Sequence, residues 1–174
     1  MQNYFEIIPM KKFRNTEKVK FYNIPLPAQI SAMDLVFHDS EAQSPGKTGD
    51  VLMPWYYHPH QMDNLFVAFG KRTVELFVIG EKQIRTFEVT PSTIFELQIE
   101  KNGDIVHRNI LCDEPAILSW DFKVFHRVTT GKEGSASVNI AVHSPEFDIK
   151  TNFNIYSLNT ETNEYAVIRE GHQD

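Results

Sequence analysis

The sequence predicts an all-β protein, a sandwich or a barrel, because short apolar runs and turn residues alternate along almost the whole chain. Val, Ile, Phe and Thr gather in short segments, and Gly, Pro, Asn and Asp separate them. Roughly ten such segments follow one another without the helical patterns that a βαβ arrangement requires. The 174 residues include 13 Phe, which is enough apolar bulk for the core of one domain.

The strands can be placed from the apolar runs and their flanking turn residues. In chain order we expect them at Leu35–Phe37, Tyr56–His60, Asn64–Phe69, Thr73–Ile79, Gln83–Val89, Ile94–Glu100, Asp104–Leu111, Ala116–Ser119, Val124–Thr129, Ser135–His143 and Glu164–Ile168. Asn102 and Gly103 predict a tight hairpin, because both residues tolerate positive φ. Further turns are expected at Phe69–Lys71 and Ile79–Glu81.

We interpret residues 1–174 as a single domain with three parts. Three prolines interrupt any long helix in residues 1–30, which we expect to form an arm along the barrel or across a neighbouring subunit. Residues 31–145 contain most of the expected strands and form the barrel core. Residues 146–174 carry scattered apolar side chains, which predict a packed C-terminal extension with a hairpin turn around Thr160–Asn163.

The charge balance argues against a nucleic-acid partner, because 23 acidic residues outnumber 17 basic ones. A single cysteine cannot form an internal disulfide. The N-terminal residues lack a basic segment followed by an apolar one, and no apolar run approaches the roughly 20 residues that cross a bilayer. We therefore expect a cytoplasmic protein without a membrane partner.

The most informative segment is His58-Pro59-His60. Side chains two residues apart on an extended strand point to the same face, and proline favours an extended conformation for the residue before it. Two imidazoles placed in this way can share one divalent ion. The other interpretation is that both are hydrogen-bonded core histidines.

Two motifs in this chain resemble those of the cupin superfamily. The first, G-x5-H-x-H-x3-4-E-x6-G, matches His58 and His60, with Asn64 at the glutamate position and Gly70 closing the motif one residue early. The second, G-x5-P-x-G-x2-H-x3-N, matches His126, but its proline, second glycine and asparagine positions hold Asp121, Lys123 and Thr130. The resemblance implies a cupin-type double-stranded β-helix, or jelly-roll barrel.

The resemblance also implies a metal site in the barrel. Its ligands would be His58, His60 and His126, with Asn64 as a weak fourth ligand or as a hydrogen-bond partner of a bound water. Imidazoles suit a divalent transition metal such as Fe, Zn, Ni, Mn or Co, and three protein ligands leave positions open for a small, anionic ligand. Asp63 has the opposite parity to His60, so we expect it, like Gln61, at the surface or in a turn.

Other polar residues have two interpretations each. Arg72 and Arg127 can pair with a substrate carboxylate, although a surface ion pair is the expected role of each. Residues 137, 139, 141 and 143 share one strand face, so Asn139 and His143 either line a cavity or face water.

Three functions remain open. The first is a metal-dependent small-molecule enzyme with dioxygenase, isomerase or lyase chemistry. The second is a cupin that binds a metabolite or metal without catalysis, and the third is a metal-free cupin like the deoxysugar epimerases, which use a histidine–aspartate base and a tyrosine acid. No catalytic residue is assigned. We also expect a homodimer paired through the N-terminal arm.

Overall fold

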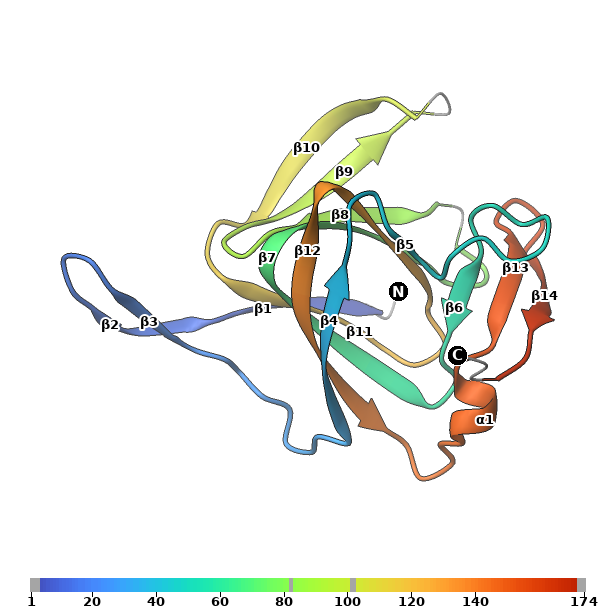
Figure 1. Cartoon of the computed structure of the whole chain (residues 1–174), viewed down its shortest axis with the longest axis horizontal. Helices are drawn as coiled ribbons and strands as arrows, with labels where there is room; N and C mark the ends of the chain where they lie inside the picture. Colours follow the sequence, from blue (N-terminus) through green and yellow to red (C-terminus); the bar gives the residue numbers. More distant parts are fainter. Residues whose placement is uncertain (1–3, 82, 101–102, 172–174) are drawn as a thin grey trace.

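The computed structural model describes residues 4–81, 83–100 and 103–171, and these residues are folded almost entirely as β-strands (Figure 1). The elements are β1 (Phe5–Pro9), β2 (Lys11–Asn15), β3 (Lys20–Asn23), β4 (Ala32–His38), β5 (Gln43–Ser44), β6 (Trp55–Tyr57), β7 (Gln61–Phe77), β8 (Arg85–Val89), β9 (Ile94–Ile99), β10 (Ile105–Cys112), β11 (Ala116–Trp120), β12 (Phe125–His143), α1 (Ile149–Asn152), β13 (Ile155–Asn159) and β14 (Glu164–Arg169). The all-β prediction is confirmed.

Two long strands, β7 and β12, organise the barrel. They pair antiparallel along their whole lengths, from Phe125 opposite Phe77 to His143 opposite Gln61. The first half of β7 also pairs with β11, and its second half pairs with β8. The second half of β12 pairs with β4, and its first half pairs with β5 and β6. Each long strand therefore contributes to both layers of the jelly roll.

The core lies between these layers. One cluster of buried apolar side chains consists of Leu65, Val67, Val74, Leu76, Phe87, Val89, Ile94, Ala116, Leu118, Trp120, Val124 and Val128. A smaller aromatic cluster of Trp55, Phe77, Phe125 and Tyr156 lies where β6 and β13 meet β12. Inward-facing residues alternate along these strands, as expected for strands with one face in a core.

The turn predicted at Phe69–Lys71 is wrong, because β7 continues through it. Gly70 has φ +68° and lies so close to β12 that a Cβ there would overlap the carbonyl oxygen of Gly134. The pairing register with β12 passes from Val67 to Phe69 without Ala68, which marks a bulge. The backbone freedom of glycine bends the strand here instead of reversing it.

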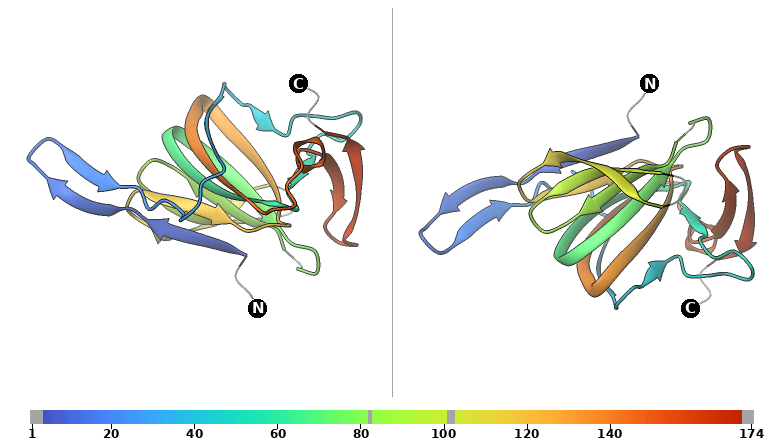
Figure 2. Two further views of the ribbon diagram at one scale, coloured as in Figure 1. Left: turned by 90° about the horizontal axis from the view of Figure 1, so that it is seen from below. Right: turned by 90° about the horizontal axis from the view of Figure 1, so that it is seen from above.

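The N-terminal segment is divided between the barrel and a projecting hairpin. β1 pairs with β11 and so belongs to the main sheet, which the sequence did not predict. β2 and β3 pair only with each other among the described strands, and Figure 2 shows their hairpin extending away from the barrel. Its exposed apolar side chains include Phe13 and Val19.

The C-terminal segment packs against the opposite end of the barrel (Figure 2). β13 pairs with β6 and with β14, and the predicted hairpin turn near Thr160–Asn163 is confirmed. β9 and β10 pair antiparallel around Gly103, whereas Asn102 lies outside the described residues. Within the described residues, none of the helices has the length and apolar character needed to cross a membrane.

Candidate functional site

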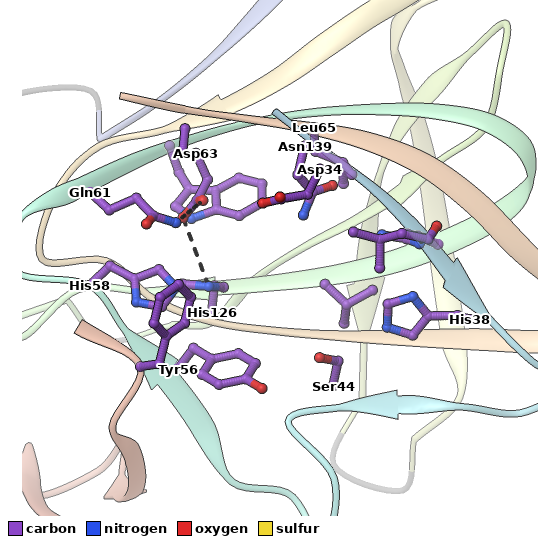
Figure 3. A pocket seen from close by; sticks show the side chains of 16 residues that line it. Asp34, His38, Ser44, Tyr56, His58, Gln61, Asp63, Leu65, His126 and Asn139 are labelled. Carbon is purple, nitrogen blue, oxygen red and sulfur yellow. Dashed lines mark hydrogen bonds and ion pairs between the residues drawn. The ribbon is translucent and has the colours of Figure 1, made fainter. Parts of the chain in front are cut away.

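A cavity of about 250 Å³ lies between the two layers of the barrel. Figure 3 shows His58, Gln61, Asp63 and His126 gathered at one end of it. Trp120 and Phe153 also line the cavity, and they make it partly apolar. A concave, partly apolar cavity with converging polar groups is typical of a small-molecule site.

His58, Asp63 and His126 form a compact cluster. One ligand atom from each lies within 4.8 Å of the other two, and the distance from His126 Nε2 to Asp63 Oδ2 is 4.0 Å. All three side chains are buried, with exposed fractions of 5%, 6% and 5%. His58 directly follows β6, whereas Asp63 and His126 lie at the starts of β7 and β12, so the fold joins residues that are far apart in sequence.

Backbone carbonyl groups fix the orientation of both imidazoles. His58 Nδ1 contacts the carbonyl oxygen of Asn152, and His126 Nδ1 contacts that of Val124 at 3.1 Å. A carbonyl oxygen only accepts, so each Nδ1 must donate and must carry the hydrogen. In a neutral ring, Nε2 then keeps a lone pair. In many metal sites, the ring nitrogen that does not bind the metal donates a hydrogen bond of this kind, which orients the histidine.

The Asp63 carboxylate accepts a hydrogen bond from Gln61 and has the indole N–H of Trp120 beside it. Gln61 Nε2 donates to Asp63 Oδ1 at 2.7 Å, and Gln61 Oε1 accepts from Asn152 Nδ2 and from His143 Nε2, both at 3.1 Å. Asp63 Oδ2 is buried and has no hydrogen-bond partner among the described residues. A buried acceptor without a partner is costly, which suggests that this oxygen meets a proton or a cation in the working protein.

Burial shifts the protonation of Asp63 and His126 towards their neutral forms. Burial raises the pKa of Asp63, although the nearby His58, the hydrogen bond from Gln61 and the indole N–H of Trp120 oppose the shift. Burial, followed by repulsion from His58, lowers the pKa of His126 well below its usual value. Burial also lowers the pKa of His143. The imidazole of His126 is therefore neutral at physiological pH and available as a base or a ligand.

Comparisons with known proteins identify the architecture. No protein-family model and no curated protein matches this sequence. Solved structures do match. QdtA, a sugar 3,4-ketoisomerase from Thermoanaerobacterium thermosaccharolyticum solved with TDP, has a TM-score of 0.54 at 14% identity, covering 95% of this chain and 89% of that chain. The fold is that of the cupins.

A second match agrees. A dTDP sugar isomerase from Desulfovibrio desulfuricans G20 has a TM-score of 0.51 at 12% identity, covering 82% of this chain and 84% of that chain. At such low identities the likeness shows the cupin fold and leaves the chemistry to be argued from the site.

The cupin barrel brings together only two of the four predicted ligands, His58 and His126. Pro59 and His60 form a turn between β6 and β7, so the extended strand on which the His58–His60 pairing rested is not formed. His60 Nδ1 instead contacts the hydroxyl group of Ser144 at 3.1 Å. Asn64 donates from Nδ2 to the carbonyl oxygen of Ile140 at 3.0 Å and does not line the cavity.

Two residues expected at the surface are at the site. Gln61 and Asp63 are buried because β7 turns the odd-numbered residues of its first half into the cavity. Asp63 and His60 were therefore correctly expected to face opposite ways. The prediction was wrong about which of the two faces inward. Asn152 was missed altogether, since no pattern in the sequence connects a short polar helix with residues 58 and 61.

Some of the remaining polar candidates line the cavity, and others do not. Asn139 lines the cavity, and His143 is half-buried and stacks on Phe147 with ring centroids 3.5 Å apart. Arg127 forms an ion pair with Glu75, as expected, but the two side chains are only 14% and 18% exposed, so the pair is not at the surface. Arg72 forms no ion pair with a described residue, is 1% exposed and lines the cavity.

Proposed function

We propose that this cupin is a small-molecule enzyme and that His58, His126 and Asp63 hold a divalent transition metal in its cavity. The observation that carries the proposal is the convergence of two imidazoles and one carboxylate within 4.8 Å of one another. Two histidines and one carboxylate with open positions are the donor set of many non-haem iron enzymes, and zinc, nickel, manganese and cobalt also accept them.

The residues fit such an ion in three further respects. Asp63 Oδ2 has no hydrogen-bond partner among the described residues, so a cation would satisfy it. Each imidazole donates its Nδ1 hydrogen to a backbone carbonyl and presents Nε2. The aromatic rings of Tyr56 and Trp120 lie 5.8 and 5.2 Å from the His126 ring, which restricts water on that side.

When bound, a metal would polarise an oxygen atom of the substrate. The remaining tasks fall to the chain. Gln61 holds one carboxylate oxygen of Asp63 and leaves the other free. Tyr56 and Asn139 line the cavity and can hydrogen-bond a substrate oxygen. The cavity volume of about 250 Å³ favours a small substrate, or the reactive part of a larger one.

The test is elemental analysis of protein purified without a metal-chelating tag. We expect about one equivalent of a transition metal per chain, lost in His58→Ala, His126→Ala and Asp63→Asn. His60→Ala is the matched control, since His60 lies two residues from His58 but outside the cluster. Metal loss in His60→Ala with full retention in Asp63→Asn would contradict the assignment. If the protein binds the metal but turns over no small molecule, it is a binding protein and not an enzyme.

The second candidate is a metal-free isomerase that uses the same cluster as acid and base. The 4.0 Å approach of Asp63 to His126 and the lowered pKa of His126 favour it, and two structural neighbours are named as sugar isomerases. Neutral His126 would remove a proton from the carbon beside a carbonyl group. The electron pair moves to the carbonyl oxygen, which Tyr56 protonates to give an enediol. The Tyr56 tyrosinate then takes the proton of the hydroxyl group on the first carbon, that carbon becomes the new carbonyl, and His126 returns its proton to the former carbonyl carbon, which completes the isomerisation.

Chelation distinguishes these candidates. A metal-free isomerase keeps its activity in the presence of a strong chelator and incorporates solvent deuterium into its product. A metal-dependent enzyme loses activity with its metal and regains it when the metal is restored.

We also propose a homodimer. Met33, Leu35 and Phe37 on β4 and Phe69 on β7 are between 61% and 71% exposed, and these two strands lie on either side of β12. The β2–β3 hairpin projects nearby with its own exposed apolar side chains (Figure 1). Exposed apolar surface of this extent is typical of an interface, and a second copy offers the matching one.

Light scattering tests the dimer. The wild-type mass should be that of two chains, and Leu35→Lys should reduce it to one. Ile105→Lys is the control, because Ile105 is also exposed, at 51%, but lies on β10. A monomeric wild-type mass would refute the proposal.

A further inference from the structure

Arg72 is the largest fully buried side chain of the described residues, at 1% exposure, and it lines the cavity. It belongs to the second half of β7, opposite Thr130 of β12 and Val89 of β8. A fully buried arginine is rare without an acidic partner, because the guanidinium stays charged and loses its hydration.

The guanidinium is fixed along one edge. Nε donates to the hydroxyl group of Ser135 at 2.9 Å, and Nη2 donates to the carbonyl oxygen of Val36 at 3.1 Å. Nη1 makes no hydrogen bond to any described residue. An arginine has five N–H groups, so the two bonds leave donors for a planar acceptor with two oxygens.

Arg72 forms no ion pair within the described parts of the chain, although Asp34 and Asp63 also line the cavity. Arg85, Arg108 and Arg127 each form an ion pair with a glutamate, but no carboxylate lies within 4.0 Å of Arg72. Burial lowers the pKa of Arg72 to about 10, so the side chain is still cationic at neutral pH. A buried cation held by two neutral acceptors is a ready anion site.

Two further polar groups, His38 and Ser44, line the cavity with Arg72, and the charge of Arg72 acts on His38. Figure 3 shows His38 and Ser44 at the end away from His58 and Gln61. His38 Nδ1 is buried and has no hydrogen-bond partner among the described residues. Burial and the positive charge of Arg72 lower the pKa of His38 to about 4, so His38 is neutral and able to donate one hydrogen bond.

We propose that Arg72, together with His38 and Ser44, binds a carboxylate group of the ligand. The proposal deepens the proposed function, because it assigns the substrate to the small carboxylic acids, with the carboxylate at Arg72 and the reacting oxygen at the His58–Asp63–His126 cluster. A single positive charge matches a monoanion. A dianionic phosphate would need further cations, which the described lining residues do not supply.

The test uses metal-stripped protein, so that it does not depend on the metal assignment. Acetate, its uncharged analogue acetamide, and inorganic phosphate are titrated while the ring resonances of His38 are followed by NMR. The variants are Arg72→Met, His58→Ala, and the matched control Arg108→Met, which removes an arginine outside the cavity whose side chain is 48% exposed. Circular dichroism establishes that each variant is folded.

We expect acetate, but not acetamide, to shift the His38 resonances to saturation. Arg72→Met should weaken acetate binding by at least about tenfold, the effect of losing a charge-assisted pair of hydrogen bonds. Arg108→Met and His58→Ala should bind acetate as the wild type does. Retained binding in His58→Ala separates this proposal from the metal site, which the same variant destroys.

Three results would overturn the proposal. In the first, acetate does not shift the His38 resonances of the wild type to saturation. In the second, Arg72→Met binds acetate with unchanged affinity, and in the third, the wild type binds phosphate more tightly than acetate. If Arg72→Met does not fold, the wild-type comparison of acetate with acetamide decides, because equal responses to both would exclude recognition of the charge.

Discussion

The pH dependence of the free energy of unfolding measures how strongly the cavity disfavours a protonated His38. His38 lines the cavity and has its pKa lowered from 6.5 to about 4, first by burial and then by the neighbouring charge of Arg72. We predict that replacing His38 by glutamine, which is neutral at every pH, removes a specific loss of stability in acid.

The sign follows from proton binding. Below pH 6.5 the unfolded chain protonates this imidazole while the folded protein does not, so the unfolded state binds more protons and stability falls as the pH falls. The loss begins near pH 6.5 and is complete below about pH 4. At about pH 5 the two pKa values give roughly 2 kcal/mol. Because the ring is only half-buried, solvent screening reduces this to about 1 kcal/mol.

The assay is urea unfolding of wild type and His38→Gln at about pH 7.5 and about pH 5. Other groups whose pKa is shifted by burial, including Asp63, His126 and His143, also affect stability, but they contribute equally to both proteins. The wild type should lose about 1 kcal/mol more than the variant between the two pH values. Equal losses, or a larger loss in the variant, would show that the cavity does not suppress the charge of His38.

Two further predictions concern the backbone bend and the helix behind the site. Gly70→Ala should destabilise the protein by about 2–4 kcal/mol in thermal or urea unfolding, because the new Cβ meets the carbonyl of Gly134. Gly80→Ala, at φ +94° with open space around it, should cost only about 1–2 kcal/mol, and equal costs would contradict the packing argument. Asn152 Nδ2 donates to Gln61 Oε1, and Gln61 in turn positions Asp63. Asn152→Ala should therefore weaken metal binding by about tenfold and cost about 1–2 kcal/mol of stability. Unchanged metal affinity in a direct titration would refute this positioning role of Asn152.

The fold was predictable because its signals are local and repeated. Apolar runs and turn residues located most strands from β4 to β12, and the motif histidines His58 and His126 were correctly placed inside the barrel. β1 and β13 were missed, since Phe5–Pro9 ends in proline and Ile155–Asn159 is a short run interrupted by Ser157 and Asn159. Their pairing with β11 and β6 is decided by tertiary packing.

The site was less predictable because alternation shows which residues share a face but not which face is inward. Both faces of the segment 61–67 carry polar and apolar side chains, so hydrophobicity does not decide between Asp63 and Asn64. The turn at His60 depends on how β6 meets β7. The burial of Arg72 depends on partners 36 and 63 residues away in the chain.

The irregularity at Ala68 has a consequence for the whole cavity. Before it, odd-numbered residues of β7 such as Asp63 point inward; after it, Arg72, Val74 and other even-numbered residues do. A regular strand would have kept one phase throughout and directed Lys71 inward in place of Arg72. Because of this one inserted residue, a single strand directs both Asp63 and Arg72 into the cavity. The backbone of β7 fixes the separation between this acid and this cation.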